Sequence, residues 1–298
     1  MKTTGFGNKV FDTVNFTLVL LLCLMIVLPF WYMFVLSVSD PFKVGMKEVA
    51  LIPQGVNFKS YMAVLQENQI VNAYWNSIRY TVVGTFMVIV VACLTAYPLA
   101  LQRFGSRKAI TILFTITMFF SGGMIPTFML IRGLGMLDTI WAVTLPAVFG
   151  FWNIIILRTN FQSLPRELFE SAYMDGANDW RILFQIVIPL SGPILATLTL
   201  FASVGFWNAF FAPLLYLTSP EMHPLTIILR RVLVANEVLS SEAINSANSL
   251  VMDPIADAGR TTSIRMATVF VTIGPIVLIY PFVQRYFVKG ILVGSVKG

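Results

Sequence analysis

The chain has 298 residues, of which 57% are hydrophobic and only 11% are charged, whereas soluble domains carry about a quarter charged residues. The charges cluster between long uncharged stretches, which is typical of a chain that crosses a bilayer repeatedly and argues against a soluble globular domain. The net charge of +6 fits the basic excess that membrane proteins collect on their cytoplasmic side, and we predict no nucleic-acid partner.

Six apolar stretches are long enough to span a membrane, because about 20 apolar residues cross the hydrocarbon core. In chain order they are residues 16–38, 80–101, 109–131, 139–157, 186–217 and 266–284. The fifth stretch contains Pro189, Pro193 and Pro213, so we expect its helix to bend and then to break near Pro213. The sequence therefore predicts an all-α membrane protein with six transmembrane helices, which form a single domain over residues 16–298.

The distribution of basic residues predicts the orientation. The short connection between the second and third spans carries Arg103, Arg107 and Lys108, which favours the cytoplasm for this connection and for both termini (N-in/C-in). The cytoplasmic segments are then residues 1–15, 158–185 and 285–298, and the long external segments are residues 39–79 and 218–265. From the sequence, the external segments are interpreted equally well as a docking surface or as solvated connectors.

Several kinds of site are missing from the sequence. No ionisable residue lies in the middle of a span, which weighs against a proton-coupled carrier, although sodium coupling through carbonyl and hydroxyl groups stays open. There is no G-x-x-x-x-G-K-[ST] phosphate-binding loop, so we predict that this chain is not an enzyme and that any ATPase is another subunit. With a single histidine and two cysteines in apolar stretches, no metal site is predicted.

The cytoplasmic loop between the fourth and fifth spans has the clearest local signals. Ser163 is a candidate helix cap, Pro165 fits a first turn, Gly176 suits a left-handed helix end, and Asn178 or Asp179 can cap the next helix. The apolar side chains that share one face of the predicted helix are Leu164, Leu168, Phe169, Ala172 and Tyr173. Because so short a helix is not stable alone, this face must pack either on the chain's own helices or in the groove of a partner.

The same loop resembles that of a known family. The run from Glu170 to Ala177 reads E-S-A-Y-M-D-G-A and closely resembles the E-A-A-x-x-D-G-A loop of binding-protein-dependent ABC importer permeases, with serine in place of the first alanine. The resemblance implies a type I ABC importer permease fold, in which this helix is the coupling helix that sits in a cleft of the ATPase. The residues implied to couple to the ATPase are Glu170, Ser171, Ala172, Asp175, Gly176 and Ala177.

Other segments resemble a sugar-transporting branch of that family. The run from Tyr286 to Gly298 is similar to the tail of MalG-type sugar permeases, which implies that the ATPase is contacted by Ser295, Val296, Lys297 and Gly298. The runs 121–127 and 206–214 resemble the LplC/YtcP-type branch, and alginate-importer permeases are similar. This likeness implies the import of oligosaccharides, including acidic, uronate-type ones.

The family implies the partners and the location. The resemblance predicts a second homologous permease chain, two ATPase subunits that hold ATP and magnesium, and an external solute-binding protein. This chain would bind no cofactor itself and would lie, surrounded by lipid, as a multi-pass protein in the bacterial cytoplasmic (inner) membrane. The alternatives are an ion-coupled secondary transporter working alone and an ABC permease for a non-sugar solute.

Two pairs of residues are candidates for the sugar path. A sugar site needs aromatic faces for stacking and amide or hydroxyl groups for hydrogen bonds, and Trp152 with Asn153 and Trp207 with Asn208 offer both. The alternative is that these tryptophans pack within the helices or lie at the membrane interface, and that the asparagines bond to neighbouring helices.

Overall fold

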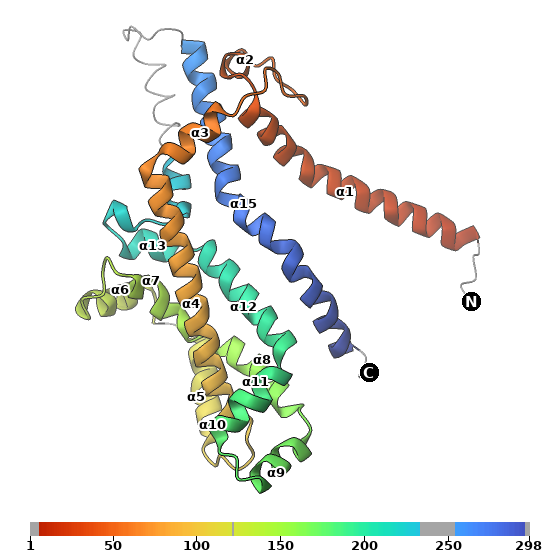
Figure 1. The fold of residues 1–298 in the computed structure, drawn as a ribbon, viewed down its shortest axis with the longest axis vertical. Coiled ribbons are helices and arrows are strands. Elements are labelled where there is room, and N and C mark those ends of the chain that lie inside the picture. Colours follow the sequence, from red (N-terminus) through yellow and green to blue (C-terminus); the bar gives the residue numbers. More distant parts are fainter. Residues whose placement is uncertain (1–5, 121, 233–253, 296–298) are drawn as a thin grey trace. The chain divides into compact units, whose positions relative to one another are not determined.

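The computed structural model describes residues 6–120, 122–232 and 254–295 of the chain (Figure 1). All regular secondary structure within these ranges is helical, so the predicted all-α fold is confirmed. The chain divides into two compact units. The first consists of Met1–Asn68 and Leu229–Ile273, and the second of Gln69–Ile228 and Gly274–Gly298.

The described elements are all helices. In chain order they are α1 (Phe6–Val38), α2 (Pro41–Gly45), α3 (Lys59–Gln66), α4 (Asn68–Ala100), α5 (Arg107–Phe119), α6 (Met124–Gly133), α7 (Ile140–Val148), α8 (Phe151–Gln162), α9 (Arg166–Met174), α10 (Asp179–Ile182), the π-helix η1 (Leu183–Val187), α11 (Ile188–Leu190), α12 (Gly192–Trp207), α13 (Phe211–Tyr216), the 3₁₀-helix η2 (Pro220–Met222) and α15 (Pro254–Ser295). A further helix is described from residue 225 to residue 232.

The helices differ in how they match the predicted spans. Two of them, over Lys9–Val38 and Asn68–Ala100, are long and apolar enough to cross a membrane as single helices. Three further candidates are helix pairs: α5 with α6, α7 with α8 at a bend of 48°, and Asp179–Leu190 with α12 at a bend of 83°. By length and composition the described part of the chain therefore holds two candidate spans, or up to five if each pair counts as one. The sixth predicted stretch, residues 266–284, lies inside α15, and the total of six stays a prediction.

In the first unit, the segment after α1 folds back onto the end of that helix. The Asp40 carboxylate accepts a hydrogen bond from the Phe42 amide at 2.8 Å and so caps α2. The Asp40 amide donates to the Gln54 carbonyl and the Asn57 amide to the Val38 carbonyl, each at 2.8 Å. These bonds give this part of the predicted external segment a defined structure.

Two glycines in the first unit allow helix backbones to touch. A Cβ atom on Gly45 of α2 would collide with the carbonyl of Ile255, and one on Gly259 of α15 would collide with the carbonyl of Pro41. Larger residues at either position would push the first turns of α15 away from α2, because the colliding atoms are backbone atoms that have no rotamer to change.

The core of the second unit lies where α4, α8 and the start of the fifth predicted span meet. Its buried apolar side chains are Ala92, Cys93, Ala96, Tyr97, Leu99, Phe151, Ile154, Leu157, Phe161, Ala172, Ile182, Leu183, Val187 and Leu198. The predicted bend of the fifth span is confirmed and lies at Ser191, directly after the π-helix η1 and Pro189. A second break, at residues 208–210, precedes α13, and Pro213 occupies the first turn of that helix, where its missing N–H costs little.

The helix α4 begins well before the predicted start of the second span at Tyr80. Its first turns carry buried polar side chains that bond to residues 221–225. The side-chain amide of Asn76 donates to the Glu221 carbonyl at 2.6 Å, and the Tyr80 hydroxyl donates to the Met222 carbonyl at 2.7 Å. The Ser77 hydroxyl accepts from the backbone amide of Leu225 at 2.9 Å. Because these buried polar side chains have hydrogen-bond partners, α4 can include them. A span predicted from apolar residues alone leaves them out and therefore starts too late.

Asp138 fastens the turn before α7 to the segment after α13. Its carboxylate accepts hydrogen bonds from the Thr218 amide at 2.6 Å, the Ser219 amide at 2.8 Å and the Thr218 hydroxyl. The Thr218 and Ser219 bonds hold the pKa of the carboxyl below its ordinary value. Asp138 has a φ of +55°, a conformation that aspartate, asparagine and glycine adopt more readily than other residues.

Substitutions at Asp138 are expected to separate the contribution of its hydrogen bonds from that of its positive φ. Asp138→Ala loses the hydrogen bonds and is strained by ~1–2 kcal/mol at positive φ, so it should show the largest fall in melting temperature. Asp138→Gly keeps the backbone conformation alone and should rank second, and Asp138→Asn, which keeps an acceptor oxygen as well, should stay nearest to the wild type. The measurement is thermal unfolding in detergent. Equal melting temperatures for the three variants would contradict the anchoring role.

The sign of the pH dependence follows from the lowered pKa. A lowered folded-state pKa stabilises the protein above the ordinary aspartate pKa of 3.8, and this contribution is lost as the pH falls through the folded value. The difference in melting temperature between wild type and Asp138→Asn should therefore be constant from neutral pH to mild acid, and it should shrink only below this range.

Candidate coupling site

The loop between the fourth and fifth predicted spans folds as the short helix α9, a tight turn and α10. The prediction that Ser163 caps α9 is wrong. Its hydroxyl donates to the Asn160 carbonyl at the end of α8, at 2.7 Å, and it closes that helix instead. The helix α9 begins at Arg166, and its N-cap is Pro165, which makes no side-chain hydrogen bond.

The end of α9 confirms the predicted role of Gly176 in the backbone. Gly176 has a φ of +74°. Its amide donates to the Tyr173 carbonyl at 3.0 Å, and the Ala177 amide donates to the Ala172 carbonyl at 2.9 Å. This pair of bonds is the Schellman motif, which satisfies the last carbonyls of a helix and needs a left-handed residue at this position.

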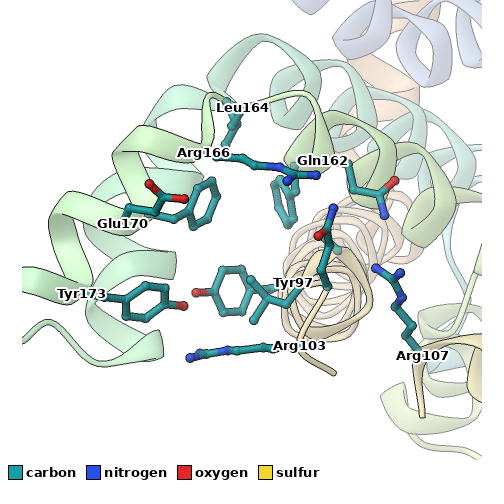
Figure 2. Close-up of a pocket in the computed structure, with 13 residues that line it drawn as sticks. Tyr97, Arg103, Arg107, Gln162, Leu164, Arg166, Glu170 and Tyr173 are labelled. Carbon is teal, nitrogen blue, oxygen red and sulfur yellow. The ribbon is translucent and has the colours of Figure 1, made fainter. Parts of the chain in front are cut away.

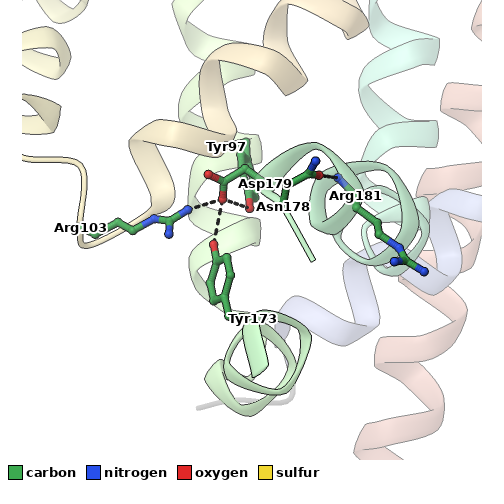
Figure 3. A network of polar contacts seen from close by, with 6 residues as sticks. All are labelled: Tyr97, Arg103, Tyr173, Asn178, Asp179 and Arg181. Atoms are coloured by element: carbon green, nitrogen blue, oxygen red, sulfur yellow. Dashed lines mark hydrogen bonds and ion pairs between the residues drawn. The ribbon is translucent and has the colours of Figure 1, made fainter. Parts of the chain in front are cut away.

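The structure distinguishes the two candidate caps of α10. The Asn178 side chain accepts a hydrogen bond from the Arg181 amide at 2.9 Å, and Asn178 is therefore the cap. Asp179 is left free for other partners, and it becomes the centre of a polar network (Figure 3).

The Asp179 network joins three segments of the second unit. The Asp179 carboxylate accepts hydrogen bonds from the Tyr97 hydroxyl of α4 at 3.1 Å and the Tyr173 hydroxyl of α9 at 2.9 Å, and it forms an ion pair with Arg103 (Figure 3). The Arg103 guanidinium lies 4.7 Å from the centre of the Tyr173 ring, a cation–π contact. Burial raises the pKa of Tyr173, so its hydroxyl stays protonated and able to donate. The end of α9 is thus tied to α4 through the side chains of Tyr173, Asp179 and Tyr97.

The two faces of α9 have different surroundings. Ala172 is buried in the core of the second unit, and Leu164, Phe169 and Tyr173 pack against that core. The apolar face therefore packs on the chain's own helices, one of the two possibilities left open by the sequence, except that Leu168 is exposed. Among the residues implied to couple to the ATPase, those that are exposed are Glu170, Ser171, Asp175 and Gly176, and Ala177 is half-buried.

Three exposed apolar side chains lie at the end of α9 and in the segment that follows it. Met174, the last residue of α9, is 88% exposed. Trp180 and Phe184 are 62% and 56% exposed, and their rings stack with centres 6.1 Å apart. The exposure of these three residues was not predicted, because within an apolar chain it depends on the turn at Gly176 and on the start of α10.

A cavity of about 640 Å³ lies between the turn after α4 (residues 101–106) and α9 (Figure 2). It is lined by Tyr97, Ala100, Leu101, Gln102, Arg103, Arg107, Phe161, Gln162, Leu164, Arg166, Phe169, Glu170 and Tyr173. Figure 2 shows Arg103, Arg107 and Arg166 approaching it from different sides. Arg103 and Arg107 indicated only the orientation of the chain in the sequence, and this cavity was not predicted.

The candidate sugar-path residues lie in two places. Trp152 and Asn153 are in the first turn of α8, directly after the bend at Gly150, and Trp152 is mostly exposed. Trp207 is the last residue of α12 and is buried, with its ring 6.4 Å from that of Tyr74. Asn208, which ends α12, is exposed.

The tail residues implied to contact the ATPase are largely outside the described part of the chain. Ser295 is the last residue of α15, whereas Val296, Lys297 and Gly298 lie outside the described residues.

Comparison with known proteins decides the family. Residues 5–293 match the family model described as "Binding-protein-dependent transport system inner membrane component". The chain belongs to this family of permeases. The family resemblance inferred from the sequence and the type I permease fold are confirmed, and a protein of this family is a membrane component of a transport system, not an enzyme.

Relatives of this permease match it over nearly its whole length. The polygalacturonan/rhamnogalacturonan transport system permease protein YtcP of Bacillus subtilis (strain 168) is 35% identical, over 98% of this chain and 99% of its own. The protein LplC of the same organism is 34% identical, over 98% and 96%. A chain in the crystal structure of a bacterial ABC transporter involved in the import of the acidic polysaccharide alginate is 31% identical, with a TM-score of 0.85 over 96% of this permease and 100% of that chain.

Proposed function

We propose that this permease is the membrane-spanning subunit of an ABC importer that takes up oligosaccharides, specifically acidic, uronate-type ones. The observation that carries the proposal is the end-to-end similarity to YtcP, named for polygalacturonan and rhamnogalacturonan, together with the TM-score of 0.85 to a chain of an alginate importer. The polymers in these names contain uronic acids, so the substrates of the relatives share a carboxylated sugar.

The proposed assembly contains four further protein subunits and the surrounding lipid. A second homologous permease encloses the path with this chain, two ATPase subunits hold ATP and magnesium, an external solute-binding protein delivers the sugar, and lipid surrounds the helices. This chain binds no cofactor. It crosses the bacterial cytoplasmic membrane with six spans and both termini inside, which places residues 158–185 and the tail Ser295–Gly298 on the side of the ATPases.

The coupling helix is proposed to work as a rigid connector. The outward residues Glu170, Ser171 and Asp175 face the ATPase, whereas the buried Ala172 and the half-buried Ala177 hold the helix to the chain's own core. Since Asp179 ties the end of α9 to α4, a displacement of α9 by the ATPases moves the spans instead of being absorbed by a loose loop.

The sugar path is proposed to include Trp152, Asn153, Trp207 and Asn208. The exposed indole of Trp152 is available for stacking on a sugar ring, and the amides of Asn153 and Asn208 can bond to sugar hydroxyls. The buried Trp207, packed near Tyr74, would shape the path by placing Asn208 at the end of α12.

Reconstitution tests the proposed function. The chain is co-expressed with the candidate permease, ATPase and binding-protein partners, and the purified complex is placed in proteoliposomes. We expect stable co-purification and ATP-dependent uptake that prefers oligogalacturonides or oligoalginates over neutral arabino-oligosaccharides. Transport by the isolated chain without an ATPase would identify a secondary carrier, and a preference for a non-sugar solute would overturn the assigned substrate.

A further inference from the structure

The cavity between the turn after α4 and the coupling helix has the size and composition of a ligand site. Its volume of about 640 Å³ is within the ~300–1,000 Å³ range of small-molecule sites. Apolar side chains that include Leu101, Phe161 and Phe169 line it together with polar groups. A ligand that fits both kinds of lining carries a charged group beside an apolar body.

The charges of the lining select an anion. Three guanidinium groups, of Arg103, Arg107 and Arg166, line the cavity with a single carboxylate, that of Glu170. Arg103 is paired with Asp179, but neither Arg107 nor Arg166 forms an ion pair within the described ranges of the chain. Arginine binds phosphate through two parallel hydrogen bonds, and Arg107 is half-buried, which reduces the screening of its charge by water.

The position of the cavity suggests where the anion comes from. The turn lies between Ala100, the last residue of a candidate span, and Arg107, the first residue of α5, which with α6 forms the next candidate. In the orientation of the proposed function, on which this inference rests, the turn lies at the cytoplasmic surface of the membrane. Anionic lipid headgroups lie at this level, and basic pockets between membrane helices bind them.

We propose that this cavity is a binding site for the phosphate headgroup of an anionic phospholipid, and that the bound phosphate bridges Arg107 and Arg166. Arg166 belongs to the first turn of α9, and Arg107 begins α5. The bridge therefore fastens the start of the coupling helix to the turn after α4, just as Asp179 fastens its end. Without the phosphate, the two like charges repel each other and loosen the helix. Transport per ATP hydrolysed thus depends on the lipid.

The test compares purified complexes in nanodiscs of phosphatidylcholine, with and without added phosphatidylglycerol. Two quantities are measured: the phosphatidylglycerol retained after detergent extraction, by mass spectrometry, and the ATP-hydrolysis rate of the complex. The variants are Arg107→Gln, Arg166→Gln and their combination. Lys108→Gln is the control, because Lys108 is exposed in the same turn, has the same charge and does not line the cavity.

We expect each arginine substitution to lower phosphatidylglycerol retention roughly fivefold, as for the loss of one basic contact to an anionic lipid, and the Lys108→Gln complex to retain the lipid. In the wild-type complex without sugar, added phosphatidylglycerol should slow ATP hydrolysis. In the double variant it should leave the hydrolysis rate unchanged. Equal retention in the Arg107→Gln and Lys108→Gln complexes would overturn the inference. If the double variant does not assemble, the phosphatidylglycerol retained by the single variants tests the inference.

Two further outcomes separate the alternatives. Inorganic phosphate that reproduces the effect in phosphatidylcholine alone would overturn the lipid as the source of the anion. Loss of the ATPase subunits from the arginine variants at every lipid composition would overturn the ligand site and identify a protein contact. Retention is measured without sugar, so a complex that holds the lipid but imports no oligosaccharide contradicts only the proposed function.

Discussion

Replacement of Gly176 by proline is expected to leave the permease inserted and assembled while ATP hydrolysis no longer drives uptake. Proline fixes φ near about −65° and has no N–H, whereas Gly176 has a φ of +74° and its amide donates to Tyr173. The Schellman motif is lost, which costs more than about 1 kcal/mol because proline fits neither the φ nor the hydrogen-bonded N–H of this position, and α9 no longer ends where Asn178 and Asp179 need it. We expect ATP hydrolysis to continue and uptake per ATP to fall at least about tenfold, because 1.4 kcal/mol already changes an equilibrium tenfold.

The chain offers a matched control for this variant at the end of α6. Gly135 has a φ of +64°, its amide donates to the Arg132 carbonyl, and the Met136 amide donates to the Ile131 carbonyl, which is the same motif. Gly135→Pro should lower the melting temperature but leave uptake per ATP unchanged.

Gly176→Asn, which tolerates positive φ and keeps the amide, should stay near wild type. The measurement is sugar uptake and phosphate release in the same proteoliposomes. A normal ratio for Gly176→Pro would remove the coupling role from this turn.

Asp179→Ala is expected to have the next largest effect. It removes the shared acceptor of the Tyr97 and Tyr173 hydroxyls and the partner of Arg103. The side chains of the ion pair are 53% and 47% exposed, so the pair itself contributes at most about 1 kcal/mol. With the two hydroxyl bonds the loss is about 2 kcal/mol, or roughly thirtyfold in the equilibrium for detaching the end of α9 from α4. Uptake per ATP should fall, with the ATPase subunits still bound.

A graded series separates the charge of Asp179 from its hydrogen bonds. Asp179→Asn keeps an acceptor for the tyrosine hydroxyls and should show an intermediate ratio of uptake to hydrolysis. The double variant Asp179→Ala with Arg103→Gln should be less impaired than the sum of the single variants, since both remove the same interaction. Strict additivity of the two substitutions would show that the ion pair does not link α9 to the turn after α4.

The features predicted correctly depend on neighbouring residues. Gly176 was predicted as a left-handed helix end and Asn178 as a possible cap, because such motifs are encoded within a few residues. The bend in the fifth span was likewise predicted from its prolines. The family was recognised from the run between Glu170 and Ala177, which is one continuous segment of the chain.

The features that were missed depend on residues far apart in sequence. Asp179 meets Tyr97 and Arg103 across 82 and 76 residues, and no local pattern records such pairs. One signal was present: Asn178 and Asp179 were both candidates for a single cap, so one of the two side chains was available for another partner. The early start of α4 was missed because Asn76 is polar, and its helix position depends on a carbonyl at Glu221.

The π-helix at Leu183–Val187 affects how the fifth span is compared with its relatives. A π turn contains one residue more than an α turn, and each residue of an α-helix advances the side-chain direction by about 100°. Every side chain of α11, which follows η1 directly, therefore points about 100° away from where uninterrupted α-helical counting from α10 would place it. A relative that lacks this extra residue would enter the bend at Ser191 with a different face of this helix turned toward the core of the second unit, even with the same amino acids and an unchanged α9.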